Sequence, residues 1–122
     1  MIKRKKFGQH FLKSDHIAKF IVDSLNLKHS DIVYEIGTGR GILLPLLCKK
    51  SKCVITIGKD KSLFKDAFEK FSMFNNLTIM YGDGFKQNEK FDIFVSNIPY
   101  SKSKTAIQWT LMQKFTTGVI MI

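Results

Sequence analysis

The chain has 122 residues, of which 44% are hydrophobic, so it can bury one core and is too short for several domains. Its 20 Lys and Arg against 10 Asp and Glu give a formal net charge of +10 at pH 7, which favours polyanions as partners. Neither an apolar run of ~18 residues nor a signal-peptide core is present, so we expect a cytoplasmic protein with no membrane contact.

The residues before position 30 predict one helix. Ser14 or Asp15 can cap this helix, and apolar side chains recur at helical spacing at Ile17, Phe20, Ile21 and Leu25. After residue 30, short β-branched runs alternate with helical runs, which is typical of βαβ units and a parallel sheet. Strands are predicted at 31–36, 53–57, 77–81, 91–96 and 118–122, and helices at 42–50, 62–71 and 104–114. Right-handed crossovers then place helices on both faces of an α/β sheet.

Cys48 and Cys53 are too far apart for a CxxC pair, and no histidine cluster accompanies them. Each has apolar neighbours, so we interpret both as small buried hydrophobic residues in a reducing compartment. The sequence therefore predicts neither a disulfide nor a metal site.

A glycine-rich turn, Glu-Ile-Gly-Thr-Gly-Arg-Gly at 35–41, lies between the first predicted strand and the next helix. Glycines at alternating positions let the backbone turn sharply and approach a ligand closely, and the amides that start the helix point into the same space. The spacing differs from the GxGxxG of dinucleotide-binding folds, and no GK[ST] follows, which disfavours a phosphate loop. The pattern resembles the first motif of Rossmann-like S-adenosylmethionine methyltransferases, whose glycine turn lies against the cofactor.

Two acidic positions bear on such a cofactor. The second strand should end in an acid that accepts from the ribose hydroxyls, but this chain has Gly58 where those methyltransferases usually have Glu. A lost charge-assisted hydrogen bond costs ~1.5–3 kcal/mol, so affinity depends on whether Asp60 or water substitutes. Asp83 follows the third strand and is placed to accept from the adenine amino group, although an ordinary turn is the alternative.

The Asn-Ile-Pro-Tyr motif at 97–100 follows the strand predicted at 91–96. The exocyclic nitrogen of adenine is a weak nucleophile because its lone pair is delocalised into the ring. The Asn97 side-chain oxygen and a carbonyl of Ile98 or Pro99 can accept the amino hydrogens, which directs the lone pair at a methyl donor. Tyr100 can stack on a flipped base, and no metal is needed. Asn and Pro are also common in plain turns, so the order of the motifs along the chain supports the catalytic interpretation.

Three motifs together resemble the ribosomal RNA adenine dimethyltransferases, a family that includes the small-subunit enzymes and the macrolide-resistance enzymes. They are Gly-Gln-His-Phe-Leu at 8–12, which is similar to the family's GQ-x-FL signature, and the motifs at 35–41 and 97–100. The resemblance runs from about Phe7 to the last residue. It implies a Rossmann-like sheet, S-adenosylmethionine as cofactor, and N6-methylation of adenine in ribosomal RNA, with dimethylation expected. The GQHFL form favours the small-subunit branch.

The resemblance, with the reasoning above, assigns roles to single residues. The expected cofactor contacts are Gln9, His10, Leu12, Glu35, Gly37, Gly39, Asp60, Asp83 and Asn97. The expected catalytic residues are Asn97, Pro99 and Tyr100, and the expected contacts to RNA phosphates are Lys3, Arg4, Lys5 and Lys6. The partner is expected to be ribosomal RNA or the pre-ribosomal small subunit, bound by a monomer.

The apolar run at 118–122 stops inside a predicted strand, so we expect a fragment of a longer protein. Residues 1–30 are expected to form a basic segment and a helix that packs on the cofactor pocket. Residues 31–122 are expected to form a partial methyltransferase domain truncated within its fifth strand. The family's further strands and helical RNA-binding domain would then be absent.

Three other functions remain open. A non-catalytic nucleic-acid-binding relative is favoured by Gly58 but disfavoured by an intact Asn-Ile-Pro-Tyr motif. A small-molecule or protein methyltransferase explains neither the basic charge nor the motif at 8–12. A nicotinamide dehydrogenase requires a different glycine spacing.

Overall fold

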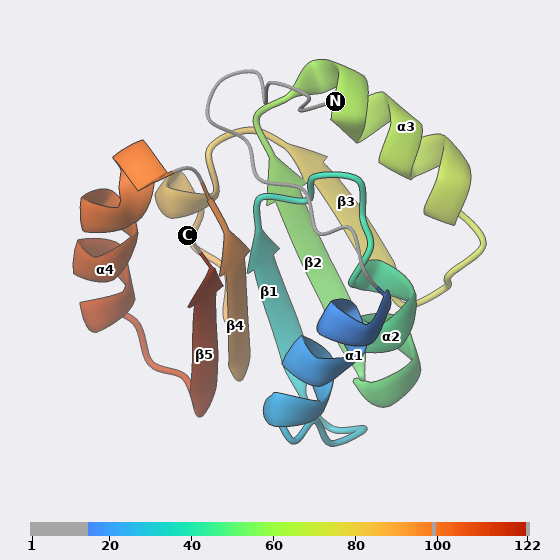
Figure 1. The fold of residues 1–122 in the computed structure, drawn as a ribbon, viewed down its shortest axis with the longest axis horizontal. Coiled ribbons are helices and arrows are strands. Elements are labelled where there is room, and N and C mark those ends of the chain that lie inside the picture. Colours follow the sequence, from blue (N-terminus) through green and yellow to red (C-terminus); the bar gives the residue numbers. More distant parts are fainter. Residues whose placement is uncertain (1–14, 99, 122) are drawn as a thin grey trace.

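The computed structural model describes residues 15–98 and 100–121 and contains one parallel sheet of five strands in the order β3-β2-β1-β4-β5 (Figure 1). The strands are β1 (Ile32–Ile36), β2 (Cys53–Gly58), β3 (Leu77–Tyr81), β4 (Ile93–Asn97) and β5 (Thr117–Met121). The predicted α/β class and all five predicted strands are confirmed, with shifts of one or two residues at several ends. Ile122, the predicted last strand residue, lies outside the described residues.

The described part of the chain also contains four α-helices, of which α1 precedes the first strand, and two short 3₁₀ helices. The α-helices are α1 (Asp15–Ser24), α2 (Leu44–Lys50), α3 (Lys61–Phe71) and α4 (Ser103–Leu111), and the 3₁₀ helices are η2 (Gly84–Lys86) and η3 (Tyr100–Lys102). Helix α2 begins two residues later than predicted, because proline in its first turn starts the helix rather than continuing one. Helix α4 ends three residues early, where Met112 and Gln113 donate i−3 hydrogen bonds that tighten and close its last turn.

Helix α1 exposes part of the apolar stripe that its sequence suggested. Ile21 and Leu25 are buried, but Ile17 and Phe20 are 50% and 74% exposed. The buried stripe is completed by Ala18 and Val22, which lie further round the helix, because successive residues are rotated by ~100°. The smaller side chains therefore face the sheet.

The core has two parts, one on each face of the sheet. Helices α1, α2 and α3 pack over one face against residues such as Val33 and Val54. Helix α4 and η2 cover the other face, where Tyr34 and Phe94 are buried. Figure 1 shows α1 and α2 in front of the sheet and α4 at its β5 edge. This is the three-layer arrangement expected of right-handed crossovers on a parallel sheet.

The order of the strands determines where a ligand can bind. The chain adds β2 and β3 on one side of β1 and then returns to add β4 and β5 on the other side. In such sheets a crevice opens at the carboxyl ends of the two central strands, where the direction of winding reverses. Here those strands are β1 and β4, with Ile36 paired to Ser96, so residues 37 and 97 adjoin the crevice.

The aromatic cluster under α4 should dominate the stability of the fold. Phe94 is fully buried, and its ring centroid lies 4.9 Å from that of Trp109. Phe94→Ala should reduce the free energy of unfolding by ~3–5 kcal/mol, measured by urea denaturation, because a large cavity replaces the ring. Leu111→Ala, at a side chain that is 81% exposed, should change it by less than ~0.5 kcal/mol. Equal losses for the two variants would contradict this account of the core.

Candidate functional site

A cavity of about 270 Å³ lies at the carboxyl ends of the strands. Its lining comes from the ends of β1, β2 and β4 and from the segment between β3 and η2. Five of the residues predicted to bind the cofactor line it together: Gly37, Gly39, Asp60, Asp83 and Asn97. The fold therefore brings these separate motifs to one site.

The glycine turn lies directly against the end of β4. Gly37 has φ +91°, in the left-handed region that glycine tolerates best, and a Cβ atom there would collide with the backbone carbonyl oxygen of Asn97. The Gly37 amide donates to the Ile57 carbonyl at 2.8 Å, which ties the turn to β2 as well. A side chain at position 37 would push the turn away from Asn97, so glycine is required here for steric reasons.

A buried chain of hydrogen bonds supports the glycine turn from behind. The Thr56 hydroxyl donates to Glu35 Oε1 at 2.6 Å, and the Thr38 and Thr56 hydroxyl oxygens lie 2.7 Å apart. Either hydroxyl can be the donor in the bond between the two threonines. The chain links β1 and β2 to the turn through three side chains that are 7% exposed or less.

Glu35 lies beside the main cavity and not in its lining. Its side chain is 2% exposed and borders a small adjoining hollow of about 20 Å³ that Gly37, Arg40 and Asn97 also line. Burial raises the pKa of Glu35 from 4.5 to about 8, and the Thr56 hydrogen bond offsets only part of that rise. At neutral pH the protonated form therefore predominates. The expected direct contact of Glu35 with a cofactor stays a prediction.

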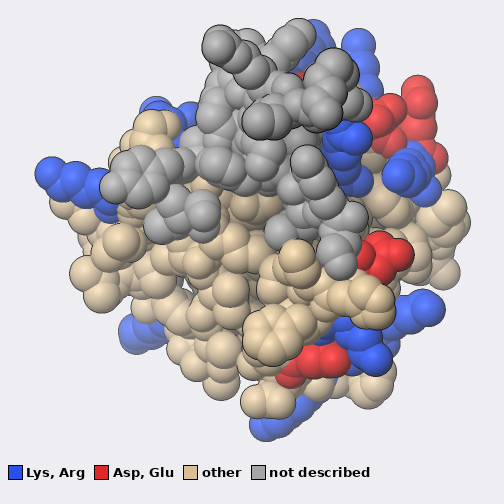
Figure 2. All heavy atoms as spheres, viewed as in Figure 1, with Lys and Arg blue, Asp and Glu red and all other residues tan. Residues whose placement is uncertain are grey.

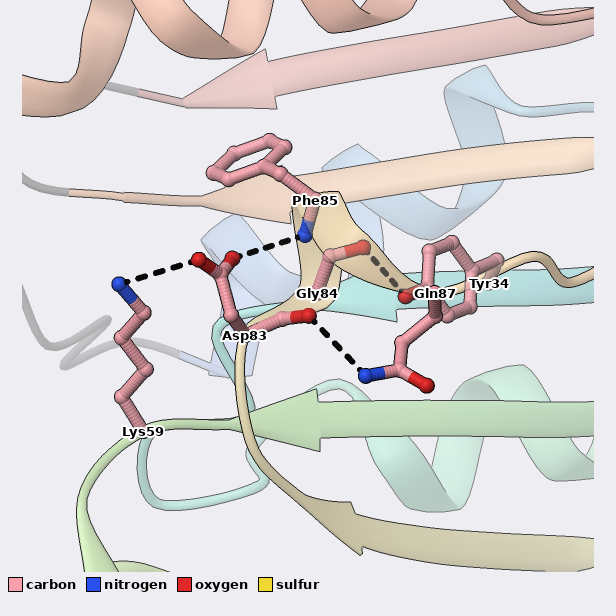
Figure 3. A network of polar contacts seen from close by, with 6 residues as sticks. All are labelled: Tyr34, Lys59, Asp83, Gly84, Phe85 and Gln87. Atoms are coloured by element: carbon pink, nitrogen blue, oxygen red, sulfur yellow. Dashed lines mark hydrogen bonds and ion pairs between the residues drawn. The ribbon is translucent and has the colours of Figure 1, made fainter.

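Asp83 is held in position by its own loop, as Figure 3 shows. Its Oδ1 accepts from the Phe85 amide at 3.0 Å, and its Oδ2 lies 3.5 Å from Lys59 Nζ. Tyr34 donates from its hydroxyl to the Gly84 carbonyl at 2.6 Å, which anchors the same loop to the core. The carboxylate is thus fixed at the cavity with one oxygen toward Lys59.

The end of β2 differs from the acidic end that a ribose site favours. Asp60 Oδ1 accepts from the Leu63 amide at 3.0 Å and caps α3, so that oxygen already has a structural role. Gly58 lines the cavity with an ordinary backbone φ, and a Cβ atom there would lie 3.4 Å from Thr38 Oγ1. A Cβ atom therefore fits at position 58 in ordinary van der Waals contact and without backbone strain.

The other predicted site residues fall outside the described residues, entirely or in part. Gln9, His10, Leu12 and Pro99 are among them, as are Lys3, Arg4, Lys5 and Lys6. Tyr100 begins η3. No residue of α1 lines the cavity; this helix packs into the core beside α2. Closure of the pocket by residues 1–30 stays a prediction.

The sequence did not predict a role at the site for two residues, Thr56 and Lys59. Thr56 lies within a β-branched strand and looks like an ordinary strand residue until its register opposite Glu35 is known. Lys59 lines the cavity, but a lone lysine beside a glycine carries no sequence signal. Only the position of each residue relative to the carboxyl ends of β1 and β2 could have identified it.

The described residues constrain other kinds of site. Among residues 15–98 and 100–121, no three His, Cys, Asp or Glu side chains are grouped so as to hold a metal ion. Cys48 is buried and Cys53 half-buried, and both are free thiols.

None of the described helices is long and apolar enough to cross a membrane. On the face seen in Figure 2, the Lys and Arg side chains of the described residues lie around the margin.

The fold belongs to the Rossmann-like methyltransferases. A crystal structure of a dimethyladenosine transferase from Plasmodium falciparum matches with a TM-score of 0.82 and 34% identity, over 91% of this chain and 42% of that one. The 23S rRNA methyltransferase ErmE matches in fold with a TM-score of 0.83 and 24% identity, over 91% of this chain and 47% of that one.

The chain is a member of the ribosomal RNA adenine dimethylase family, whose model matches residues 2–122. An "rRNA adenine N-6-methyltransferase" of Escherichia coli is 36% identical over all of this chain and 51% of its own length. A "Probable ribosomal RNA small subunit methyltransferase A" of Methanosarcina barkeri is 39% identical over 98% of this chain and 42% of its own length. The chain therefore spans about half the length of these curated relatives.

The buried carboxyl of Glu35 should make stability depend on pH. Its pKa is raised from 4.5 to about 8, so the folded chain holds a proton that the unfolded chain releases in this interval. The resulting stabilisation is complete below pH 4.5 and is lost as the pH rises through about 8. The free energy of unfolding should thus fall by on the order of 1 kcal/mol per pH unit in this window.

Urea unfolding at several pH values between about 5 and about 8 checks this expectation. Glu35→Gln should remove the slope, whereas Glu69→Gln, at an exposed position of α3, should retain it. Parallel slopes for the wild type and Glu35→Gln would contradict the assignment of the proton to Glu35.

Proposed function

We propose that this chain contains the cofactor-binding and catalytic motifs of an S-adenosylmethionine-dependent enzyme that methylates adenine N6 in ribosomal RNA. The observation that supports this most is the position of Asn97, at the end of β4, in the lining of the same cavity as the glycine turn. Two groups needed for the reaction, a cradle for the methyl donor and an acceptor for the amino group, are thereby adjacent. The names of the relatives support ribosomal RNA as the substrate.

The residues at the cavity fit the proposed cofactor at two of its three parts. Gly37 and Gly39 allow close approach of the amino-acid portion, and Asp83 can accept from the adenine amino group. At the ribose portion, Gly58 provides no acceptor, and this is the weak part of the fit. The cavity volume of about 270 Å³ is near the lower end of the ~300–1,000 Å³ typical of small-molecule sites.

The chemistry that the chain must supply is modest. The cofactor, when bound, provides an electrophilic methyl group on a sulfonium. Asn97 would accept a hydrogen of the target amino group through its side-chain oxygen, and the Ile98 carbonyl would accept the other. These two hydrogen bonds would draw both amino hydrogens out of the plane of the adenine ring. The nitrogen lone pair is then no longer conjugated with the ring. The close contact of Gly37 with the main chain of Asn97 would keep this acceptor beside the cradle, which favours a near-attack geometry.

The finer features of the proposal rest on the resemblance. They are two successive methyl transfers, the small-subunit RNA or pre-ribosomal small subunit as substrate, a monomeric enzyme, and contact of Lys3 to Lys6 with RNA phosphates. A basic net charge of +10 supports a polyanionic substrate. The curated relatives give no support to the non-catalytic alternative.

Asn97→Ala should separate catalysis from RNA binding. Loss of the side-chain acceptor should lower methyl transfer to ribosomal RNA at least ~100-fold, by analogy with the removal of a single oxyanion-hole donor, while RNA affinity changes less than about twofold. Incorporation of labelled methyl groups and filter binding measure the two quantities. Asn88→Ala, at an exposed loop position, serves as the matched control. Equal loss of binding and turnover in Asn97→Ala would overturn the catalytic role.

Gly58→Glu should restore a ribose acceptor. The Cβ atom of the new side chain fits beside Thr38, and its carboxylate should tighten S-adenosylmethionine binding about tenfold, which is the effect of one charge-assisted hydrogen bond. Calorimetric titration measures the dissociation constant. Gly58→Ala adds only the Cβ atom and should leave the affinity within about twofold of the wild type. The interpretation of Gly58 fails if the two variants bind the cofactor equally.

A further inference from the structure

Lys59 lies at the cavity beside Asp83, the residue proposed above to accept from the adenine amino group of the cofactor. It follows β2 directly, lines the cavity, and places its Nζ 3.5 Å from Asp83 Oδ2 (Figure 3). The Lys59 side chain is 59% exposed and that of Asp83 is 24% exposed, so both groups can be reached by a ligand. A partly exposed ion pair of this kind contributes little to stability by itself. Its position suggests a role in binding.

The pair presents a hydrogen-bond donor beside a hydrogen-bond acceptor. Asp83 is held by the Phe85 amide through Oδ1, so its Oδ2 keeps a fixed direction beside the Lys59 ammonium. Adenine presents the complementary pattern, an amino donor next to a ring-nitrogen acceptor, at N7 and also at N1. A 6-oxo purine such as hypoxanthine has an acceptor in place of the amino donor and cannot satisfy the carboxylate.

We propose that Lys59 is a specificity-determining residue that donates to a ring nitrogen of the cofactor's adenine while Asp83 accepts from the amino group. This inference rests on the proposed use of S-adenosylmethionine. It is also consistent with Gly58 at the end of β2, where an acidic residue was expected. Gly58 supplies no ribose acceptor and Asp60 Oδ1 caps α3, so a larger share of the affinity falls to the base.

The experiment couples a change in the protein to a change in the ligand. Titration calorimetry measures binding of S-adenosylhomocysteine and of its 1-deaza, 7-deaza and 6-oxo analogues to the 122-residue chain. In the wild type, replacing the ring nitrogen that Lys59 contacts by CH should weaken binding about tenfold. The 6-oxo analogue should bind still more weakly, because the Asp83 carboxylate then faces an acceptor.

Lys59→Met keeps the approximate length of the side chain and removes its charge. This variant should bind that deaza analogue with an affinity within about twofold of its affinity for S-adenosylhomocysteine. Lys59→Arg should restore the penalty, since the donor returns. Lys61→Met, at the exposed start of α3 and outside the cavity lining, should keep the wild-type penalties. A residue that merely supported the loop would weaken all ligands equally and would not alter the ratio between them.

Three outcomes would each overturn the role of Lys59. They are unchanged penalties in Lys59→Met, the absence of any deaza penalty in the wild type, and failure of the wild type to bind S-adenosylhomocysteine. The proposed function fails separately. A chain that shows the expected penalties but transfers no methyl group to ribosomal RNA keeps Lys59 as a base-reading residue and loses the proposed activity. A chain that methylates RNA without a ring-nitrogen penalty keeps the activity and loses the inference.

Discussion

The close approach of Gly37 to the backbone of Asn97 is the constraint on which the rest of the site depends. Because no Cβ fits between them, the end of β1 and the end of β4 are held at one backbone-to-backbone distance. The parallel pairing of β1 with β4 sets the register, with Ile36 opposite Ser96. The proposed cradle for a cofactor and the proposed acceptor for a target base therefore meet because of sheet topology, without any side chain having to reach across the cavity.

A second layer of polar contacts holds that arrangement rigid. Thr38 and Thr56 extend a chain of hydrogen bonds from the glycine turn to Glu35, which is only 2% exposed. Burial makes an ionised carboxylate unfavourable, and protonation at neutral pH relieves that penalty. The neutral acid also avoids placing a negative charge close to the glycine turn. We interpret Glu35 mainly as a support of the turn, a role that a position in the cavity lining would not have allowed.

The sequence predicted the strands, their parallel arrangement and the meeting of residues 37, 83 and 97, since the carboxyl ends of parallel strands share one edge. It did not predict the partners of Glu35 or the pair of Lys59 with Asp83. Those contacts depend on register and on side-chain reach, as in the pairing of residue 35 with residue 56, which no local pattern encodes. The buried stripe of α1 was misjudged for a related reason: the packing of α1 against the sheet selected Ala18 and Val22 over the larger Ile17 and Phe20.

The residues at the end of β2 and at the end of β4 can be substituted independently. This determines the expected effect of Gly58 on catalysis. In the proposed binding mode, the end of β2 would contact the nucleoside portion of the cofactor, whereas Asn97 would contact the reacting amino group. Ribose contacts are equal in the ground state and the transition state, so their loss weakens uniform binding. Uniform binding alters KM and leaves kcat unchanged. A chain with Gly58 and an intact glycine turn against Asn97 is therefore expected to be an enzyme of low cofactor affinity, and the departure at β2 does not by itself argue for a non-catalytic protein.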